Sequence, residues 1–256
     1  MAGDSYTTRG SCEGKILSTE CSRPAAERLR EAVLFPAAHV EQMLKRGLWN
    51  GDTAPGWLRL FARNTPEKPA IIGAASTLSY GNAYVRVERL ARAFTALGLR
   101  KGDVVAIQLP NIPEFMIVYL AAGMIGAVLA PMHMPYRAGE IAPLLRHARA
   151  RLAVCGPAVG EYVPAKVLLD LRQSIDALAH VVTVGCSYPG TLPLSQLIED
   201  GPHEEIPNPG VAADPVILCF TSGTSAAPKA VVHSSYTMLA NNRLCRELIC
   251  ARKTSS

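Results

Sequence analysis

Several features that define common classes of protein are missing from this sequence. The 256 residues include only two Trp and five Phe, and no dense run of Lys and Arg is interleaved with aromatic residues. The formal net charge of +5 is mild, so we expect no nucleic-acid partner. The patterns H-E-x-x-H, G-x-S-x-G and G-x-G-x-x-G are absent, which argues against the familiar zinc-protease, serine-hydrolase and dinucleotide-binding sites. Four arginines are expected to share one solvated helix face: Arg137, Arg146, Arg149 and Arg151.

Cysteines at the spacing of a metal site or a redox pair are also missing. The seven cysteines are odd in number and none forms C-x-x-C, while Cys155 and Cys219 lie within apolar, strand-like stretches. We therefore expect reduced, mostly structural thiols and no metal ligands in a cytoplasmic protein. The first 34 residues lack the continuous apolar stretch of a signal peptide, so none is expected.

The longest uncharged stretch, residues 115–134, is long enough to cross a bilayer. Gly123, Gly126 and Pro131 interrupt it, which favours a helix followed by a short strand in the core of an α/β domain. We expect no transmembrane segment, and a membrane-associated protein that uses this stretch is the alternative.

The sequence does contain a regular alternation of strand-like and helix-like segments. Strands are predicted at residues 70–72, 77–80, 104–109, 151–155, 180–184, 216–220 and 231–235. Helices are predicted at residues 25–34, around 58–61, and at 84–99, 137–150 and 168–179. Residues 185–214 are rich in Pro and Gly and are predicted to form a surface connection. With 49% hydrophobic residues, this alternation predicts an α/β fold with a mostly parallel, doubly wound sheet.

One hydroxyl-rich loop (residues 221–229) stands out directly after a predicted buried strand. Small side chains let backbone N–H groups face an anion, and Lys229 adds a mobile positive charge suited to phosphate. It is not a Walker A loop, because Pro228 replaces the second Gly and Ala230 replaces the Mg²⁺-binding hydroxyl residue. From composition alone, an ordinary Ser/Thr/Gly turn is an equal alternative. The residues that would form the anion cradle are Thr221, Ser222, Gly223, Thr224 and Ser225.

The order of residues from Phe220 to Val231, with His233 shortly after, resembles the signature loop of the adenylate-forming superfamily. That superfamily includes acyl- and aryl-CoA synthetases, adenylation domains of peptide synthetases and luciferases. Ala226 departs from the usual Gly, and Ala230 stands where Gly is common. Weaker motifs of the same superfamily precede the loop in the same order, at residues 65–70, 78–80, 96–99, 101–106 and 111–115.

This resemblance implies an ATP-dependent acid–CoA ligase. Such an enzyme joins a carboxylic acid to the α-phosphate of ATP and then transfers the acyl group to CoA, with the help of Mg²⁺. The resemblance implies that the β- and γ-phosphates are held by Thr221, Ser222, Gly223, Thr224, Ser225 and Lys229. His233 would line the acyl pocket, with a purely structural role as the alternative.

The resemblance covers roughly residues 52–241 and only the N-terminal part of such enzymes. No residue after Lys229 matches the later motifs for adenine, ribose and the catalytic Lys, so we assign no catalytic residue. We expect an N-terminal extension, partly disordered, at residues 1–50, a partial adenylate-forming domain at 51–243, and a truncated helix with a polar tail at 244–256. On this view the chain is an inactive fragment of a ligase. A non-catalytic phosphate-binding module and an adenylation domain that loads a carrier protein are the alternatives.

Overall fold

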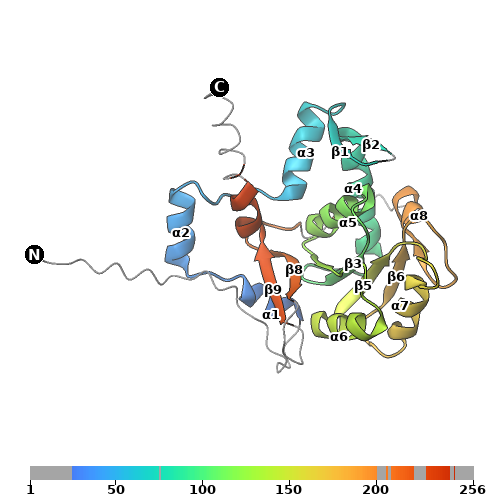
Figure 1. The fold of residues 1–256 in the computed structure, drawn as a ribbon. Helices are drawn as coiled ribbons and strands as arrows, with labels where there is room; N and C mark the ends of the chain where they lie inside the picture. Colours follow the sequence, from blue (N-terminus) through green and yellow to red (C-terminus); the bar gives the residue numbers. More distant parts are fainter. Residues whose placement is uncertain are drawn as a thin grey trace, which may run out of the picture.

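The computed structural model describes residues 25–74, 76–200, 206, 209–221, 229–242 and 245. These residues form a seven-stranded sheet with helices on both faces, and a separate two-stranded sheet lies beside α3 and α4 (Figure 1). The strands are β1 (Pro69–Ile72), β2 (Thr77–Ser79), β3 (Val104–Gln108), β4 (Val128–Pro131), β5 (Ala150–Cys155), β6 (His180–Thr183), β7 (Leu192–Pro193), β8 (Pro215–Thr221) and β9 (Lys229–Ser234). The helices are α1 (Ala25–Ala32), α2 (Ala37–Lys45), α3 (Ala54–Asn64), α4 (Tyr80–Ala96), α5 (Pro113–Met124), α6 (Ala138–Ala148), α7 (Pro164–Arg172) and α8 (Leu194–Glu199). The predicted fold class is confirmed.

The order of strands in the large sheet is β7-β6-β5-β3-β4-β8-β9. All neighbours pair in parallel except β8 and β9, which form an antiparallel hairpin. The carboxyl ends of β3, β4, β5, β6 and β8 therefore lie along one edge of the sheet. The hydroxyl-rich loop begins at this edge, where open α/β sheets commonly bind ligands.

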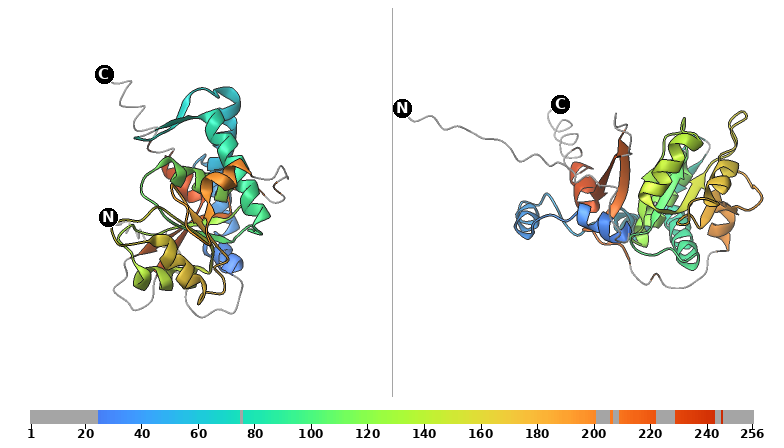
Figure 2. Two further views of the ribbon diagram at one scale, coloured as in Figure 1. Left: turned by 90° about the vertical axis from the view of Figure 1, so that its right-hand side faces the viewer. Right: turned by 90° about the horizontal axis from the view of Figure 1, so that it is seen from below.

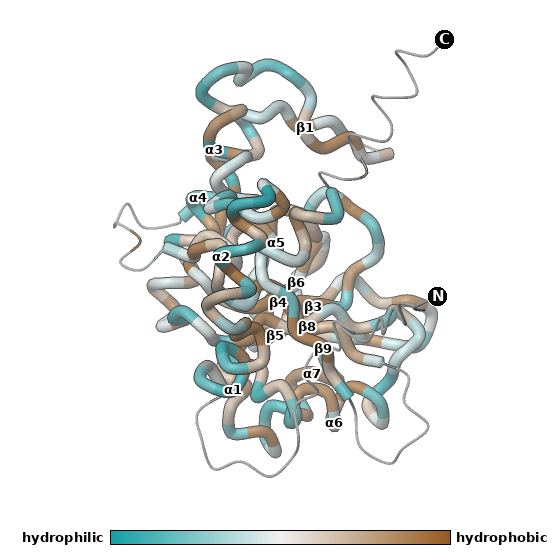
Figure 3. Tube along the Cα trace, turned by 90° about the vertical axis from the view of Figure 1, so that its left-hand side faces the viewer, coloured by the Kyte–Doolittle hydropathy of each residue, from teal (hydrophilic) through white to brown (hydrophobic). Residues whose placement is uncertain are grey.

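The core consists of two apolar layers, one on each face of the sheet (Figure 2). Val105 and Ile107 of β3 pack toward α4 and α5, while Val104 and Ala106 pack toward α6 and α7. Because successive residues of a strand point to opposite faces, a strand buried on both faces is apolar along its whole length. The strands at the centre of the molecule are accordingly brown in Figure 3.

The uncharged stretch at residues 115–134 is divided as predicted, into most of α5 and β4. Gly126 separates the two elements and has a φ of +71°, a conformation in which glycine is favoured. In the described part of the chain, no helix is both long enough and apolar enough to cross a membrane.

Four elements differ from their sequence-based predictions. The helix predicted at residues 168–179 is α7, which begins four residues earlier because Pro164 occupies its first turn. The predicted surface connection contains β7 and α8, whose Leu194 is buried in the core. The sequence also does not predict α2, which has no buried residue.

The four arginines do not share a solvated helix face, so that prediction is wrong. Arg137 lies at the N-cap of α6, and Arg149 lies at its C-cap with a φ of +51°. Arg151 belongs to β5, and its Nε lies 3.7 Å from Oδ2 of Asp103. The four arginines lie close together in the sequence but are distributed over a helix and a strand.

An ion pair fixes the start of β8 to the start of β3. Nζ of Lys101 lies 2.6 Å from Oδ2 of Asp214, whose side chain is only 4% exposed. The same carboxylate oxygen accepts a 2.7 Å hydrogen bond from the backbone N–H of Val211. A buried carboxylate needs such partners, because leaving one unpaired is costly.

We predict that Lys101→Met lowers the free energy of unfolding by about 3 kcal/mol, because it leaves Asp214 buried without its cation. Urea unfolding followed by circular dichroism measures the change. The matched control is Lys45→Met, which removes an ion pair with Glu41 of similar length whose side chains are 75% and 66% exposed. This control should cost less than about 1 kcal/mol, and equal losses in the two variants would contradict the assignment.

Candidate functional site

The candidate site lies on the β8–β9 hairpin at the carboxyl edge of the sheet. Thr221 pairs directly with Lys229, and the Thr221 hydroxyl lies 3.5 Å from the carbonyl oxygen of Lys229. The two ends of the hydroxyl-rich loop are thus held side by side. The predicted phosphate-binding residues between them, Ser222, Gly223, Thr224 and Ser225, lie outside the described residues.

Lys229 and His233 lie on the same face of the hairpin. Ala230 and Val232 are buried toward α1 and α6, so the residues that alternate with them face the other way. Lys229 is exposed and His233 is half-buried. Four strand residues span about 13 Å, so these two side chains mark separate ends of one strip.

The His233 imidazole is held from the helical segment that follows β9. The Thr237 hydroxyl lies 3.4 Å from Nδ1 of His233 and donates a 3.1 Å hydrogen bond to the carbonyl oxygen of Ser234. A hydroxyl has one proton to donate, so its oxygen is left to accept from Nδ1–H. This arrangement favours the tautomer in which Nε2 of His233 carries the lone pair.

A second polar group at the same edge was not anticipated from the sequence. Gln108 ends β3 and is 1% exposed, and its Nε2 donates 3.0 Å hydrogen bonds to the carbonyl oxygens of His133 and Tyr136. Its Oε1 accepts a 3.1 Å hydrogen bond from the Tyr162 hydroxyl. The available sequence signal was an amide side chain at the end of an otherwise apolar strand.

Arg137 completes this group above the turn that follows β4. Its guanidinium carbon lies 3.9 Å from the centre of the Tyr162 ring, and NH1 donates to the carbonyl oxygens of Met134, Pro135 and Tyr136. The sequence favours a packed role for His133, but the residue is exposed and contacts the Tyr136 ring edge-to-face at 5.2 Å. Together these contacts fix the backbone of the turn next to β8.

The thiols and the phenol near this edge are held in their neutral forms. Burial, together with a smaller effect of the neighbouring Cys186, raises the pKa of Cys155 to about 12. Burial also raises the pKa of Cys219 and is the largest cause of the raised pKa of Tyr162. These groups therefore remain protonated at neutral pH, where a thiol is a poor nucleophile.

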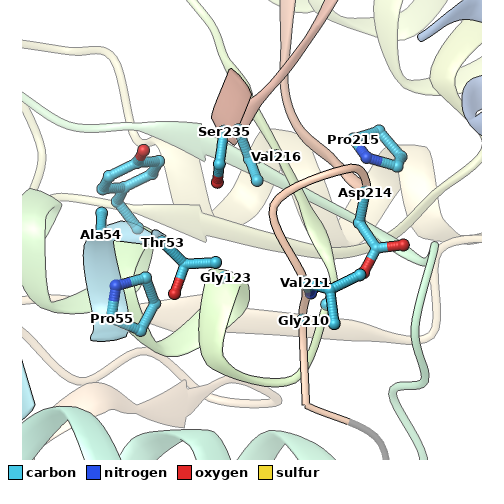
Figure 4. Close-up of a pocket in the computed structure, with 12 residues that line it drawn as sticks. Thr53, Ala54, Pro55, Gly123, Gly210, Val211, Asp214, Pro215, Val216 and Ser235 are labelled. Atoms are coloured by element: carbon cyan, nitrogen blue, oxygen red, sulfur yellow. The ribbon is translucent and has the colours of Figure 1, made fainter. Parts of the chain in front are cut away.

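Two cavities lie away from this edge. One, with a volume of about 10 Å³, lies between the start of α3, Gly123 of α5 and residues 210–216 (Figure 4). It has room for a single water molecule. A wider cleft of about 560 Å³ lies beside Arg100 and Lys101, at the opposite edge of the sheet.

Comparison with known proteins identifies the family. The family model described as "AMP-binding enzyme" matches residues 58–254. The chain belongs to the AMP-binding enzyme family. The resemblance inferred from the hydroxyl-rich loop is confirmed, whereas the roles of individual site residues stay predictions.

The chain is similar to several CoA ligases. It is 29% identical over 202 residues to the medium-chain fatty-acid–CoA ligase of Escherichia coli (strain K12), which covers 78% of this chain and 36% of that protein. It is 31% identical over 170 residues to the crotonobetaine/carnitine–CoA ligase of Citrobacter koseri, covering 65% of this chain and 32% of that protein. The chain thus spans about a third of the length of these relatives.

Solved structures of AMP-binding proteins share the fold. Apo MbtA of Mycobacterium smegmatis superposes with a TM-score of 0.72 at 25% identity, covering 81% of this chain and 38% of that chain. A putative long-chain-fatty-acid CoA ligase of Rhodopseudomonas palustris gives a TM-score of 0.63, also at 25% identity, covering 73% and 45%. Both matches cover less than half of the solved chain.

We predict that the thiols of this chain are modified in a fixed order. Cys245 is exposed and should react first with iodoacetamide at neutral pH, Cys219 more slowly, and Cys155 only after denaturation. Mass spectrometry of the tryptic peptides over time measures the order. If Cys155 of the folded protein were labelled at the same rate as Cys245, the burial assigned to Cys155 would be wrong.

Proposed function

We propose that this chain supplies the phosphate-binding part of an ATP-dependent acid–CoA ligase. The observation that supports this most directly is the pairing of Thr221 with Lys229 at the carboxyl edge of the sheet. It brings an exposed ammonium group to the end of a loop rich in hydroxyl residues. Loops of this composition bind anions through their backbone N–H groups.

The geometry of the hairpin suggests how the two substrates lie. Lys229 at one end of the strip would face the β- and γ-phosphates of ATP, together with Thr221, Ser222, Gly223, Thr224 and Ser225. His233, about 13 Å further along β9, would face the carboxylic acid. The α-phosphate then falls between the two ends, where the carboxylate has to attack.

In the proposed reaction, a carboxylate oxygen attacks the α-phosphorus of ATP and pyrophosphate leaves. The sulfur of CoA then attacks the acyl carbon and AMP leaves. Lys229 and the loop N–H groups would stabilise the negative charge that accumulates on the departing pyrophosphate. None of these steps needs a protein nucleophile, which agrees with the neutral thiols of Cys155 and Cys219.

Mg²⁺ fits this site as a companion of the nucleotide. In the described part of the chain, no three His, Cys, Asp or Glu side chains are grouped so that they could hold a metal ion. Mg²⁺ usually binds through substrate phosphates with few protein ligands. It would neutralise phosphate charge alongside Lys229.

The acid substrate is proposed only as a class. The relatives act, by name, on medium-chain fatty acids, on acetate and on crotonobetaine or carnitine. Octanoate, acetate and crotonobetaine therefore form a suitable panel, tested for acid-dependent release of pyrophosphate with and without CoA. A carrier protein in place of CoA is the alternative acceptor, and release that needs a pantetheine-loaded carrier would favour it.

We predict that Lys229→Ala weakens the binding of Mg-ATP by ten- to a hundredfold, because it removes a charge-assisted contact worth about 1.5–3 kcal/mol. Isothermal titration calorimetry on the whole chain measures the affinity. Lys45→Ala on the exposed helix α2 is the control and should leave the affinity unchanged.

An equal affinity in Lys229→Ala and the unchanged chain would overturn the assignment of the phosphate site. Binding that depends on Lys229, without acid-dependent turnover in any acid of the panel, would favour a non-catalytic phosphate-binding module.

A further inference from the structure

An N-terminal arm (residues 35–53) precedes the part of the chain that matches the family model, yet it packs against the candidate site. The arm contains Phe35, helix α2 and the connection to α3, and the family match begins only at residue 58. Figure 1 shows α2 beyond the β9 end of the sheet. Trp49 near the end of the arm is 5% exposed, although α2 itself buries no residue. Trp49 is thus the buried side chain of the arm.

Trp49 is attached to the helical segment that follows β9. Its ring stacks on the Tyr236 ring with centroids 4.8 Å apart and an interplanar angle of 3°. Phe35 and His39 contact the Trp49 ring at 4.9 and 5.4 Å, which completes a four-ring cluster. Stacked aromatic pairs add stabilisation beyond the area that they bury. The cluster therefore holds Tyr236 through residues that lie far from it in the sequence.

Tyr236 is next in sequence to the residue that holds His233. Its backbone N–H donates to the carbonyl oxygen of Ala212, and Thr237 places its hydroxyl 3.4 Å from Nδ1 of His233. Ser235, on the other side of Tyr236, lines the small cavity with Thr53 from the end of the arm (Figure 4). The arm therefore stacks on Tyr236 and shares the lining of the small cavity with Ser235.

We propose that Trp49 is a positioning residue for His233, at the end of the site that would face the carboxylic acid. By stacking on Tyr236, it fixes the turn from which Thr237 holds the His233 imidazole in one orientation and one tautomer. The role of His233 toward the acid rests on the proposed function, whereas the link from Trp49 to His233 does not. A residue outside the family match thereby acts on the predicted substrate contact.

The tautomer of His233 provides the test. The chain has six histidines, so labelling with ¹⁵N-histidine gives a small set of imidazole signals, and His233→Gln assigns the one from His233. At about pH 8.5 imidazoles are neutral, and the nitrogen shifts report which nitrogen carries the proton. In the unchanged chain we expect Nδ1–H with an unprotonated Nε2, because the Thr237 oxygen accepts from Nδ1.

Substitution of the residues that link Trp49 to His233 should change the nitrogen signal of the His233 imidazole. Thr237→Val, which deletes the acceptor, should lose the unprotonated Nε2 signal in favour of a mixture of tautomers. Trp49→Leu, which keeps an apolar side chain but removes the stack, should shift the signal in the same direction. Trp49→Phe retains a stacking ring and should preserve it. Phe61→Ala is the matched control, because Phe61 forms a ring pair with Tyr80 at 5.0 Å away from the hairpin.

An unchanged His233 signal in Trp49→Leu would overturn the proposal, provided that Thr237→Val shifts it. An equal shift in Phe61→Ala would overturn it as well, because the effect would then follow from general destabilisation. Addition of octanoate with Mg-ATP separates the two proposals. If it leaves the His233 signal of the unchanged chain in place, the acid role of His233 fails, while the comparison of tautomers still decides the role of Trp49.

Discussion

The parallel pairing of β8 with β4 is the constraint on which the candidate site depends. β8 follows 31 residues after β6 but lies on the far side of β3 and β4. Its direction brings its carboxyl end to the edge where β3, β4 and β5 also end. The chain then returns as β9, antiparallel to β8, so both ends of the hydroxyl-rich loop remain at this edge. Reversal of β8 would move the loop to the opposite edge, away from the turn after β4.

Contacts at both ends of β8 support this placement. Asp214 at its start is held by Lys101, and the turn beside its end is held by Gln108 and Arg137. The hairpin is covered on one face by Leu29 of α1 and by Val33 just after it, which join the same apolar layer as Ala230 and Val232. The site is therefore held by segments from the whole described chain, although its predicted ligand contacts occupy one short stretch.

The sequence predicted the fold and the place of the hairpin well, because both depend on local patterns. Strands buried on two faces are apolar throughout, as in β3, and a loop between two strands shows its composition directly. The role of Gln108 could not be predicted, because its partners lie 25 to 54 residues away along the chain. The stack of Trp49 on Tyr236 joins residues even further apart, and no periodicity marks it. The chemical roles of Lys229 and His233 remain predictions.

The hydrogen bonds of Gln108 limit which side chains fit at the end of β3. It offers an N–H donor to carbonyl oxygens on one side and an acceptor to a phenol on the other, as a peptide group would. Glutamate at neutral pH would direct a negative charge at those carbonyl oxygens, and leucine would remove a donor from each of them, leaving only the backbone N–H of Tyr136 and NH1 of Arg137. Asparagine has the right groups but is one methylene shorter. Of these four side chains, only glutamine therefore meets both requirements, although no ligand contact is assigned to it.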